Sequence, residues 1–365
     1  MDFDSMRPFN DEEVAQHWQL IAQHPSFKVA CLSLGISIPE TIDSVASFQA
    51  LAKEVVGHIL ERSTRSFSYT GLDNLVECES YLFVSNHRDI FLDSALLGYI
   101  FLKHGWATPQ MAVGDNLLKD PFVNALMRSN KCFAVSRSGG GKSLYALSSY
   151  IAQRRSAGHS IWIAQKGGRS KDGHDFTDLK LIKMLYLSQL RGKKSFADHI
   201  RELRIVPVSV SYEWDPCDLM KAKELYLRSP EGGSNYAKAP GEDIESMKKG
   251  ITEPKGKIAL VIGTPLEGML ETPELVAAKI DKQIITNYRL RPCNRVALHL
   301  LESQLALDNN SLNAYAAVHD GTSSCKAFVR RLQSCTLEHR PFLLRMYANP
   351  VINQRRYAPQ SVSQP

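Results

Sequence analysis

A histidine and two aspartates lie close together in residues 84–93, which read VSNHRDIFLD. His87 is followed two residues later by Asp89 and six residues later by Asp93. An imidazole oriented by a carboxylate is a common general base, so this spacing indicates proton-transfer chemistry. The same residues fit a second interpretation, in which Asn86 or Asp89 caps the following helix and His87 has no chemical role.

Two further loops combine glycines with positively charged side chains. Residues 137–143 read RSGGGKS, and residues 166–173 read KGGRSKDG. Glycines leave backbone N–H groups accessible to an anion, and the start of a helix adds positive potential. Each loop alone also fits a solvated basic turn, but together they predict a shared anion site near His87. Its candidate residues are Arg137, Lys166, Gly167, Gly168, Arg169 and Ser170.

The sequence argues against two other kinds of site, an ATP-binding loop and a metal site. The loop 137–143 resembles the phosphate-binding loop of ATPases, but Ser136 stands where that motif requires glycine. Glu213, Asp215 and Asp218 form an acidic group without a histidine, and Asp215 precedes a proline that indicates a turn. We therefore expect neither an ATPase nor a metal site.

The elements that position these residues can be read from the pattern of apolar side chains. Helical spacing extends over residues 11–23 and 42–62. His87 and both basic loops each follow a short strand-like run, which is where α/β proteins carry their chemistry. The seven runs expected to form strands are residues 66–69, 81–85, 110–113, 131–136, 160–165, 204–212 and 257–262.

Strands that alternate with helices predict an α/β fold with a mixed, mainly parallel sheet flanked by helices. N-terminal helices and a C-terminal helical extension complete the expected architecture. The predicted division is an N-terminal helical segment (1–64), an α/β domain (65–265), a C-terminal helical region (266–348) and a flexible tail (349–365). Residues 228–242, rich in Gly, Ser and Pro, are expected to form a loop.

The amino-acid composition indicates the class of protein and its cellular compartment. Of the 365 residues, 44% are hydrophobic and 22% are charged, as in folded soluble proteins. Seven scattered cysteines without close pairs indicate a reducing compartment rather than a disulfide framework or a zinc site. The polar N-terminus does not resemble a secretory signal, and no uncharged run approaches 18 residues. The expected location is cytoplasmic.

Positive charge is concentrated in the middle of the sequence. Residues 119–204 contain 17 Lys and Arg against 6 Asp and Glu, a surplus of 11, whereas the whole chain has a net charge of +6. Such a surplus indicates an anionic partner, for example phosphate groups, anionic lipid or an acidic carrier protein. No nucleic-acid recognition motif accompanies it, so nucleic acid is not expected.

Four blocks in order resemble the glycerophospholipid acyltransferase family, which contains the 1-acylglycerol-3-phosphate acyltransferases. They are Asn86-His87 with Asp93, the strand ending at Arg137, the segment 165–170, and Val206-Pro207-Val208. The resemblance extends over about residues 66–264, and SYEWDPCD at 211–218 is similar to a bacterial branch of the family.

The resemblance implies transfer of a fatty acyl group from acyl-CoA or an acyl carrier protein to a hydroxyl. The acceptor would be of the glycerol-phosphate type, such as 1-acylglycerol-3-phosphate. His87 would be the general base, oriented by Asp93 or alternatively Asp89, while Arg137 and residues 166–170 would hold the acceptor phosphate. The family needs no metal or redox cofactor. A chain of this kind without a membrane span would attach peripherally to the inner face of the membrane.

Two departures from the family pattern keep other functions open. Five residues rather than four separate His87 from Asp93, and Lys166 stands where the family has glutamate. The missing glutamate motivates one alternative, an anionic-lipid or phosphate-binding protein with impaired catalysis. A lipid hydrolase is the other alternative, although the sequence contains no Gly-x-Ser-x-Gly motif.

Overall fold

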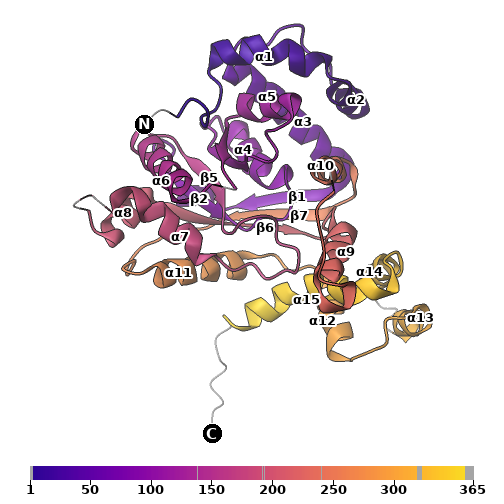
Figure 1. Cartoon of the computed structure of the whole chain (residues 1–365). Coiled ribbons are helices and arrows are strands. Elements are labelled where there is room, and N and C mark those ends of the chain that lie inside the picture. The colour runs from indigo at the N-terminus through magenta and orange to yellow at the C-terminus, as the bar shows by residue number, and fades with distance from the viewer. Residues whose placement is uncertain are drawn as a thin grey trace.

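A seven-stranded sheet forms the centre of the molecule (Figure 1). The computed structural model describes residues 3–137, 139–190, 192, 194–239, 241–318 and 323–357. In spatial order the strands are β1 (Thr64–Thr70), β7 (Gly256–Ile262), β6 (Ile205–Tyr212), β2 (Leu82–Ser85), β5 (Ile161–Ala164), β3 (Gln110–Gly114) and β4 (Cys132–Val135). Each corresponds to one of the seven predicted runs.

The strand directions confirm the predicted mixed, mainly parallel sheet. β6, β2, β5, β3 and β4 run in one direction. β7 is antiparallel to β6, and β1 is parallel to β7. The carboxyl ends of five strands therefore meet at one edge of the sheet.

Helices from the first half of the chain cover one face of the sheet (Figure 1). They are α1 (Asp11–Gln23), α2 (Pro25–Leu34), α3 (Val45–Ser63), α4 (Leu92–Lys103) and α5 (Pro121–Ser129). Their apolar sides pack on alternate strand residues such as Phe83 and Trp162, because successive side chains of a strand point to opposite faces. α2 had no counterpart among the predicted helices.

A second set of helices packs on the opposite face, against side chains such as Leu82 and Ile161. These are α6 (Gly141–Ser156), α7 (Leu179–Tyr186), α8 (Phe196–Leu203) and α11 (Pro273–Asn287). α11 was expected in a separate C-terminal helical region, but its residues Val276 and Ile280 belong to this core.

The remaining helices form a third core beside the sheet (Figure 1). They are α9 (Asp218–Arg228), α12 (Pro292–Glu302), α13 (Asn309–Val318), α14 (Ser323–Gln333) and α15 (Arg340–Arg355). α10 (Glu242–Thr252) follows the segment predicted as a loop, in which the described residues between α9 and α10 include a short 3-10 turn at Pro230–Gly232. Among the described helices, none combines the length and hydrophobicity that a bilayer crossing requires.

The predicted tail from residue 349 is wrong in its first part, because α15 continues to Arg355. Asn349 donates from Nδ2 to the carbonyl of Asp172 at 2.6 Å, and Asn353 donates to that of Gly173 at 3.0 Å. The segment was expected to be unstructured because it has Pro, Gln and Arg and few apolar residues, but tertiary hydrogen bonds hold it in the helix. The rest of the predicted tail, residues 358–365, lies outside the described residues.

Candidate active site

The candidate residues gather where β2 and β5 end. The connection after β2 enters α4 on one face of the sheet, whereas the connection after β5 enters α7 on the other face. Adjacent parallel strands whose connections leave to opposite faces open a crevice at their carboxyl ends, which is the usual ligand site of open α/β sheets. His87 and residues 166–170 both border this point.

The imidazole of His87 pairs with Asp93. His87 Nδ1 lies 2.9 Å from Oδ2 of Asp93, whose side chain is fully buried, while the His87 side chain is 16% exposed. Trp162 of β5 contacts the imidazole edge-on, with 5.6 Å between ring centroids. Nε2 has no hydrogen-bond partner among the described residues, so this nitrogen can meet a substrate.

Asp93 accepts three further hydrogen bonds. The backbone N–H groups of Arg88 and Asp89 donate to Oδ2 at 2.5 and 2.9 Å, and the Tyr212 hydroxyl donates to Oδ1 at 2.7 Å. Burial and the nearby Asp93 charge raise the pKa of Tyr212 well above its usual range, so its hydroxyl keeps the proton that it donates. These contacts fix the carboxylate and, through it, the imidazole.

Asp89 has different hydrogen-bond partners from Asp93. Its Oδ1 accepts from the backbone N–H groups of Phe91 and Leu92 at 2.9 and 2.8 Å, and so satisfies donors at the start of α4. Burial and the neighbouring Asp93 charge raise the pKa of Asp89. The structure thus combines a contact from each interpretation, since Asp89 caps α4 while Asp93 pairs with His87.

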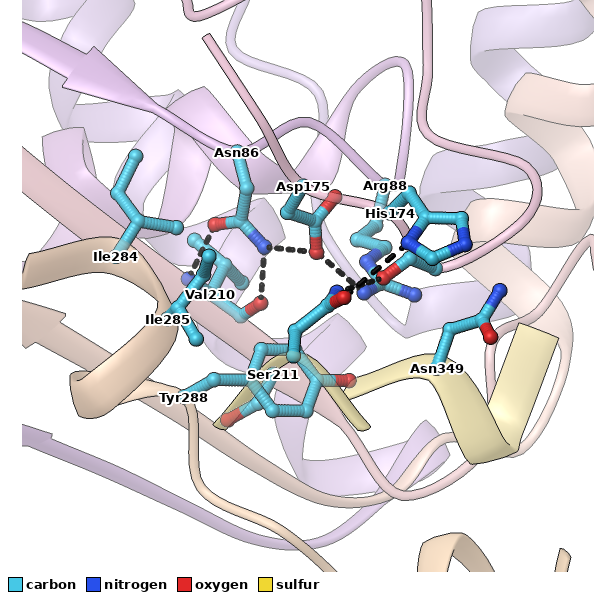
Figure 2. Close-up of polar contacts among 12 residues, drawn as sticks. Asn86, Arg88, His174, Asp175, Val210, Ser211, Ile284, Ile285, Tyr288 and Asn349 are labelled. Atoms are coloured by element: carbon cyan, nitrogen blue, oxygen red, sulfur yellow. Dashed lines mark hydrogen bonds and ion pairs between the residues drawn. The ribbon is translucent and has the colours of Figure 1, made fainter. Parts of the chain in front are cut away.

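A second buried network involves Asn86 and Arg88, the residues on either side of His87 in the chain (Figure 2). Asn86 bonds to both the N–H and the carbonyl of Val210 on β6, at 2.8 and 2.9 Å. Arg88 pairs with Asp175 at 2.5 Å and lies over the ring of Tyr288, 5.2 Å from its centroid. Although burial opposes ionisation, the Arg88 charge holds the pKa of Asp175 below its usual value.

Sequence reasoning did not identify Arg88 and Asp175 as partners. They are separated by 87 positions, and both are nearly fully buried. Each residue follows a predicted strand, but the sequence does not show that these two strands, β2 and β5, are neighbours in the sheet.

The basic loop after β5 touches the His87 turn through its backbone. The N–H of Ser170 donates to the carbonyl of His87 at 2.6 Å. A Cβ at Gly167 or Gly168 would meet no atom within 4 Å, so open space adjoins both glycines. Lys166, which replaces the expected glutamate, donates from Nζ to the carbonyl of His174 at 2.6 Å and so stabilises the loop.

Arg169 joins this loop to α10. Its Nη2 donates to the Ser246 hydroxyl at 3.2 Å, whereas its buried Nη1 has no partner among the described residues. Gly250, one turn further along α10, lies so close to Asp89 that a Cβ there would overlap its carboxylate. α10 therefore covers the site, a role that the sequence did not reveal.

Arg137 lies further from His87. It follows β4, the edge strand, which β3 and β5 separate from β2. Its backbone N–H donates to Asp115 at 3.2 Å, and its side chain is exposed and extends over Gly114 at the end of β3. The structure thus joins His87, Asp93 and Ser170 directly, but shows no contact between Arg137 and them. Ser138 of the same loop lies outside the described residues.

The acidic side chains after β6 are all engaged. Glu213 accepts from the backbone of Lys257 at 2.9 Å, Asp215 pairs with Lys221 at 2.5 Å, and Asp218 pairs with Arg331. Throughout the part of the chain that the structure describes, no group of three or more His, Cys, Asp or Glu side chains is arranged to hold a metal ion.

Residues 66–213 match the family model described as Acyltransferase. The glycerol-3-phosphate acyltransferase of Xanthomonas axonopodis pv. citri is 27% identical over 221 residues, 59% of this chain and 24% of that protein. The enzyme of the same name from Colwellia psychrerythraea is 31% identical over 135 residues, 36% of this chain and 16% of that protein. The chain thus spans at most a quarter of either relative.

Among solved structures, the 1-acyl-sn-glycerophosphate acyltransferase PlsC from Thermotoga maritima is 15% identical, with a TM-score of 0.37. The match covers 75% of this chain and 92% of that protein. The family model and the curated relatives agree on the same chemistry. Residues 66–213, less than half of the chain, are therefore similar to acyltransferases.

Proposed function

We propose that the protein transfers a fatty acyl group from an acyl thioester, acyl-CoA or acyl carrier protein, to a hydroxyl of a glycerol-phosphate-type acceptor. The observation that carries this proposal is the His87–Asp93 pair. Asp93 holds Nδ1 at 2.9 Å, and Nε2 is left without a partner among the described residues at the edge of an open, glycine-containing loop. This arrangement supports the role of His87 as a general base, because such a base needs one ring nitrogen held by a carboxylate and the other available to the substrate.

In the proposed reaction, Nε2 of His87 removes the proton of the acceptor hydroxyl while its oxygen attacks the thioester carbonyl. Asp93 stabilises the imidazolium that forms and keeps the ring in the tautomer with hydrogen on Nδ1. The tetrahedral intermediate then breaks its carbon–sulfur bond. The imidazolium returns the proton to the departing sulfur, so that the products are an ester and a free thiol.

The acceptor phosphate would bind to the loop after β5. Arg169 Nη1 offers unused N–H groups, and Gly167 and Gly168 let a ligand approach the backbone. Ser170 anchors the loop to the His87 turn, while Lys166 supports it through His174. Arg137 approaches from the β3 side and would reach the far side of the acceptor. A fixed phosphate aligns the hydroxyl with Nε2.

The positive surplus in residues 119–204 suits this function, because acyl-CoA, acyl carrier protein and phospholipid headgroups are all anionic. We place the protein in the cytoplasm, peripherally attached to the inner face of the membrane, with no cofactor beyond the thioester substrate. Nucleic acid has no part in the proposal.

The test is a thiol-release assay with acyl-CoA and acyl carrier protein as donors, and glycerol-3-phosphate and 1-acylglycerol-3-phosphate as acceptors. We expect His87→Ala to lower kcat by about 10²- to 10⁴-fold, the usual contribution of a positioned general base. His104→Ala is the control, because His104 is exposed and bonds only to Tyr69.

Full activity in His87→Ala would overturn the mechanism. Thiol release that yields free fatty acid without an acylated acceptor would instead establish a hydrolase. Binding to anionic vesicles without thiol release from either donor would establish a lipid-binding protein.

A further inference from the structure

A cavity lies away from His87. It has a volume of about 510 Å³ and opens between α14 and the end of the sheet where β6 finishes and β1 begins. Its wall includes Arg65, Glu213, Trp214, Arg330 and Arg331. The volume falls within the range of small-molecule sites in proteins. None of the residues of the His87 site lines it.

Positive charge dominates the wall, with three arginines against one glutamate. Arg330 is exposed and forms no ion pair with any residue that the structure describes. Arg65 is 66% exposed, and its Nη1 lies 3.9 Å from Oε1 of Glu213, a distance that makes a weak contact in water. Two guanidinium groups at the cavity therefore keep most of their N–H donors available.

The third guanidinium is rigidly held. Arg331 donates from Nε and Nη2 to the buried carboxylate of Asp218, at 2.9 and 2.5 Å. The Tyr347 hydroxyl donates to the same carboxylate at 2.7 Å. Nη1 of Arg331 has no hydrogen-bond partner among the described residues. A fixed guanidinium with a free edge loses little entropy when it binds an oxyanion.

We propose that this cavity binds a phosphate group, either that of a phosphorylated small molecule or free phosphate. Arg65, Arg330 and Arg331 would supply charged N–H donors, and Ser324 in the wall would supply a hydroxyl. Trp214, in the same wall, suits a flat or apolar portion of the ligand. Two sources share this chemistry: the adenosine bisphosphate end of coenzyme A, which rests on the proposed function, and free phosphate.

The test measures binding by isothermal titration calorimetry on the full chain. The probes are coenzyme A, adenosine 3′,5′-bisphosphate and inorganic phosphate. The host is the His87→Ala variant, so that turnover does not interfere. Arg65→Gln combined with Arg330→Gln removes two cavity charges but spares Arg331, which neutralises Asp218. Arg345→Gln, exposed on α15, is the matched control.

We expect at least one probe to bind, and the double variant to weaken that binding at least tenfold while Arg345→Gln leaves it unchanged. Equal affinity for coenzyme A and adenosine 3′,5′-bisphosphate identifies the nucleotide end as the source, whereas binding of inorganic phosphate alone identifies free phosphate. Absence of binding, or equal binding by the double variant, would overturn the proposal. The thiol-release assay is read separately, so failure of acyl transfer does not alter this result.

Discussion

At the scale of single residues, two neighbouring aspartates have separate environments. Asp93 accepts hydrogen bonds from an imidazole, a phenol and two backbone N–H groups. Asp89 accepts two backbone N–H groups through Oδ1, but its buried Oδ2 has no partner among the described residues. An orienting carboxylate needs a charge that is fixed by hydrogen bonds to both oxygens, so Asp93 fits the role better than Asp89.

We predict that Asp93→Asn lowers kcat by roughly 10²- to 10⁴-fold, because the amide cannot stabilise the imidazolium. Its stability should also fall by about 1–3 kcal/mol, since an amide NH₂ in place of Oδ2 faces donors rather than acceptors. Asp89→Asn should stay within a few-fold of wild-type kcat, because its Oδ1 still caps α4. Steady-state thiol release and urea unfolding measure both effects.

The pH dependence of stability distinguishes Asp89 from Asp93 further. A raised pKa means that ionised Asp89 is unfavourable in the folded state, so wild-type stability decreases as pH rises above about 3.9, the usual aspartate value. Asp89→Asn removes this penalty and should gain stability over wild type at pH 7 but not at pH 4. A larger kcat loss in Asp89→Asn than in Asp93→Asn would mean that Asp89, and not Asp93, orients His87.

At the scale of elements, the site is closed by segments from distant parts of the chain. α10 reaches Arg169 through Ser246 and contacts Asp89 through Gly250. α15 supports the loop after β5 through Asn349 and Asn353. The glycine in α10 is needed because any side chain there would meet the Asp89 carboxylate.

We predict that Gly250→Ala destabilises the protein despite the higher helix propensity of alanine. The propensity gain is about 1 kcal/mol, whereas overpacking of a buried contact typically costs 1–3 kcal/mol. We also expect a higher KM for the acceptor, because α10 must shift away from Arg169 and Asp89. Thermal unfolding and acceptor titrations measure these changes.

Gly57→Ala in α3 is the matched control. A Cβ there would lie 3.7 Å from Tyr99 Cε2, an ordinary contact, so this variant should be as stable as wild type or more stable. If Gly250→Ala gains stability as Gly57→Ala does, the contact between α10 and Asp89 is not tight and the prediction is wrong.

At the scale of the whole molecule, buried polar contacts connect the C-terminal helices to the candidate active site. Asp215 donates from its backbone N–H to the Tyr347 hydroxyl at 3.1 Å and pairs with Lys221. Lys221 in turn donates to the carbonyl of Arg88 at 2.7 Å, one residue from His87. Arg331 and Asp218 form the outer end of this series, so the third core is fastened to the sheet by charges as well as by packing.

We predict that Arg331→Leu lowers the free energy of unfolding by about 3–5 kcal/mol, because it leaves the buried Asp218 carboxylate without its cation. Arg331→Leu combined with Asp218→Asn should recover part of this loss, since the uncompensated charge is gone. Arg345→Leu, at an exposed position, should stay within about 0.5 kcal/mol of wild type. Urea unfolding at pH 7 compares the three variants, and an unchanged midpoint in Arg331→Leu would contradict the prediction.

The sequence by itself determined the strands of the sheet and the candidate residues at its edge. All seven strands were predictable because short runs of β-branched and aromatic residues are bounded by turn residues, a local signal. His87 and the glycine loop after β5 were picked out as candidates by residue types and spacing within a few positions of the chain, whereas the preference for Asp93 over Asp89 came from the family resemblance.

Tertiary structure alone decided which of these groups meet and what surrounds them. The pairing of Arg88 with Asp175, the cover provided by α10, and the position of Arg137 beyond β5 and β3 all depend on strand order. The end of α15 was predicted wrongly because the segment is poor in apolar residues, whereas its Asn349 and Asn353 bond to a loop more than 170 residues away. The type of a side chain determines which groups it can bond to, whereas the fold determines which of those groups it meets.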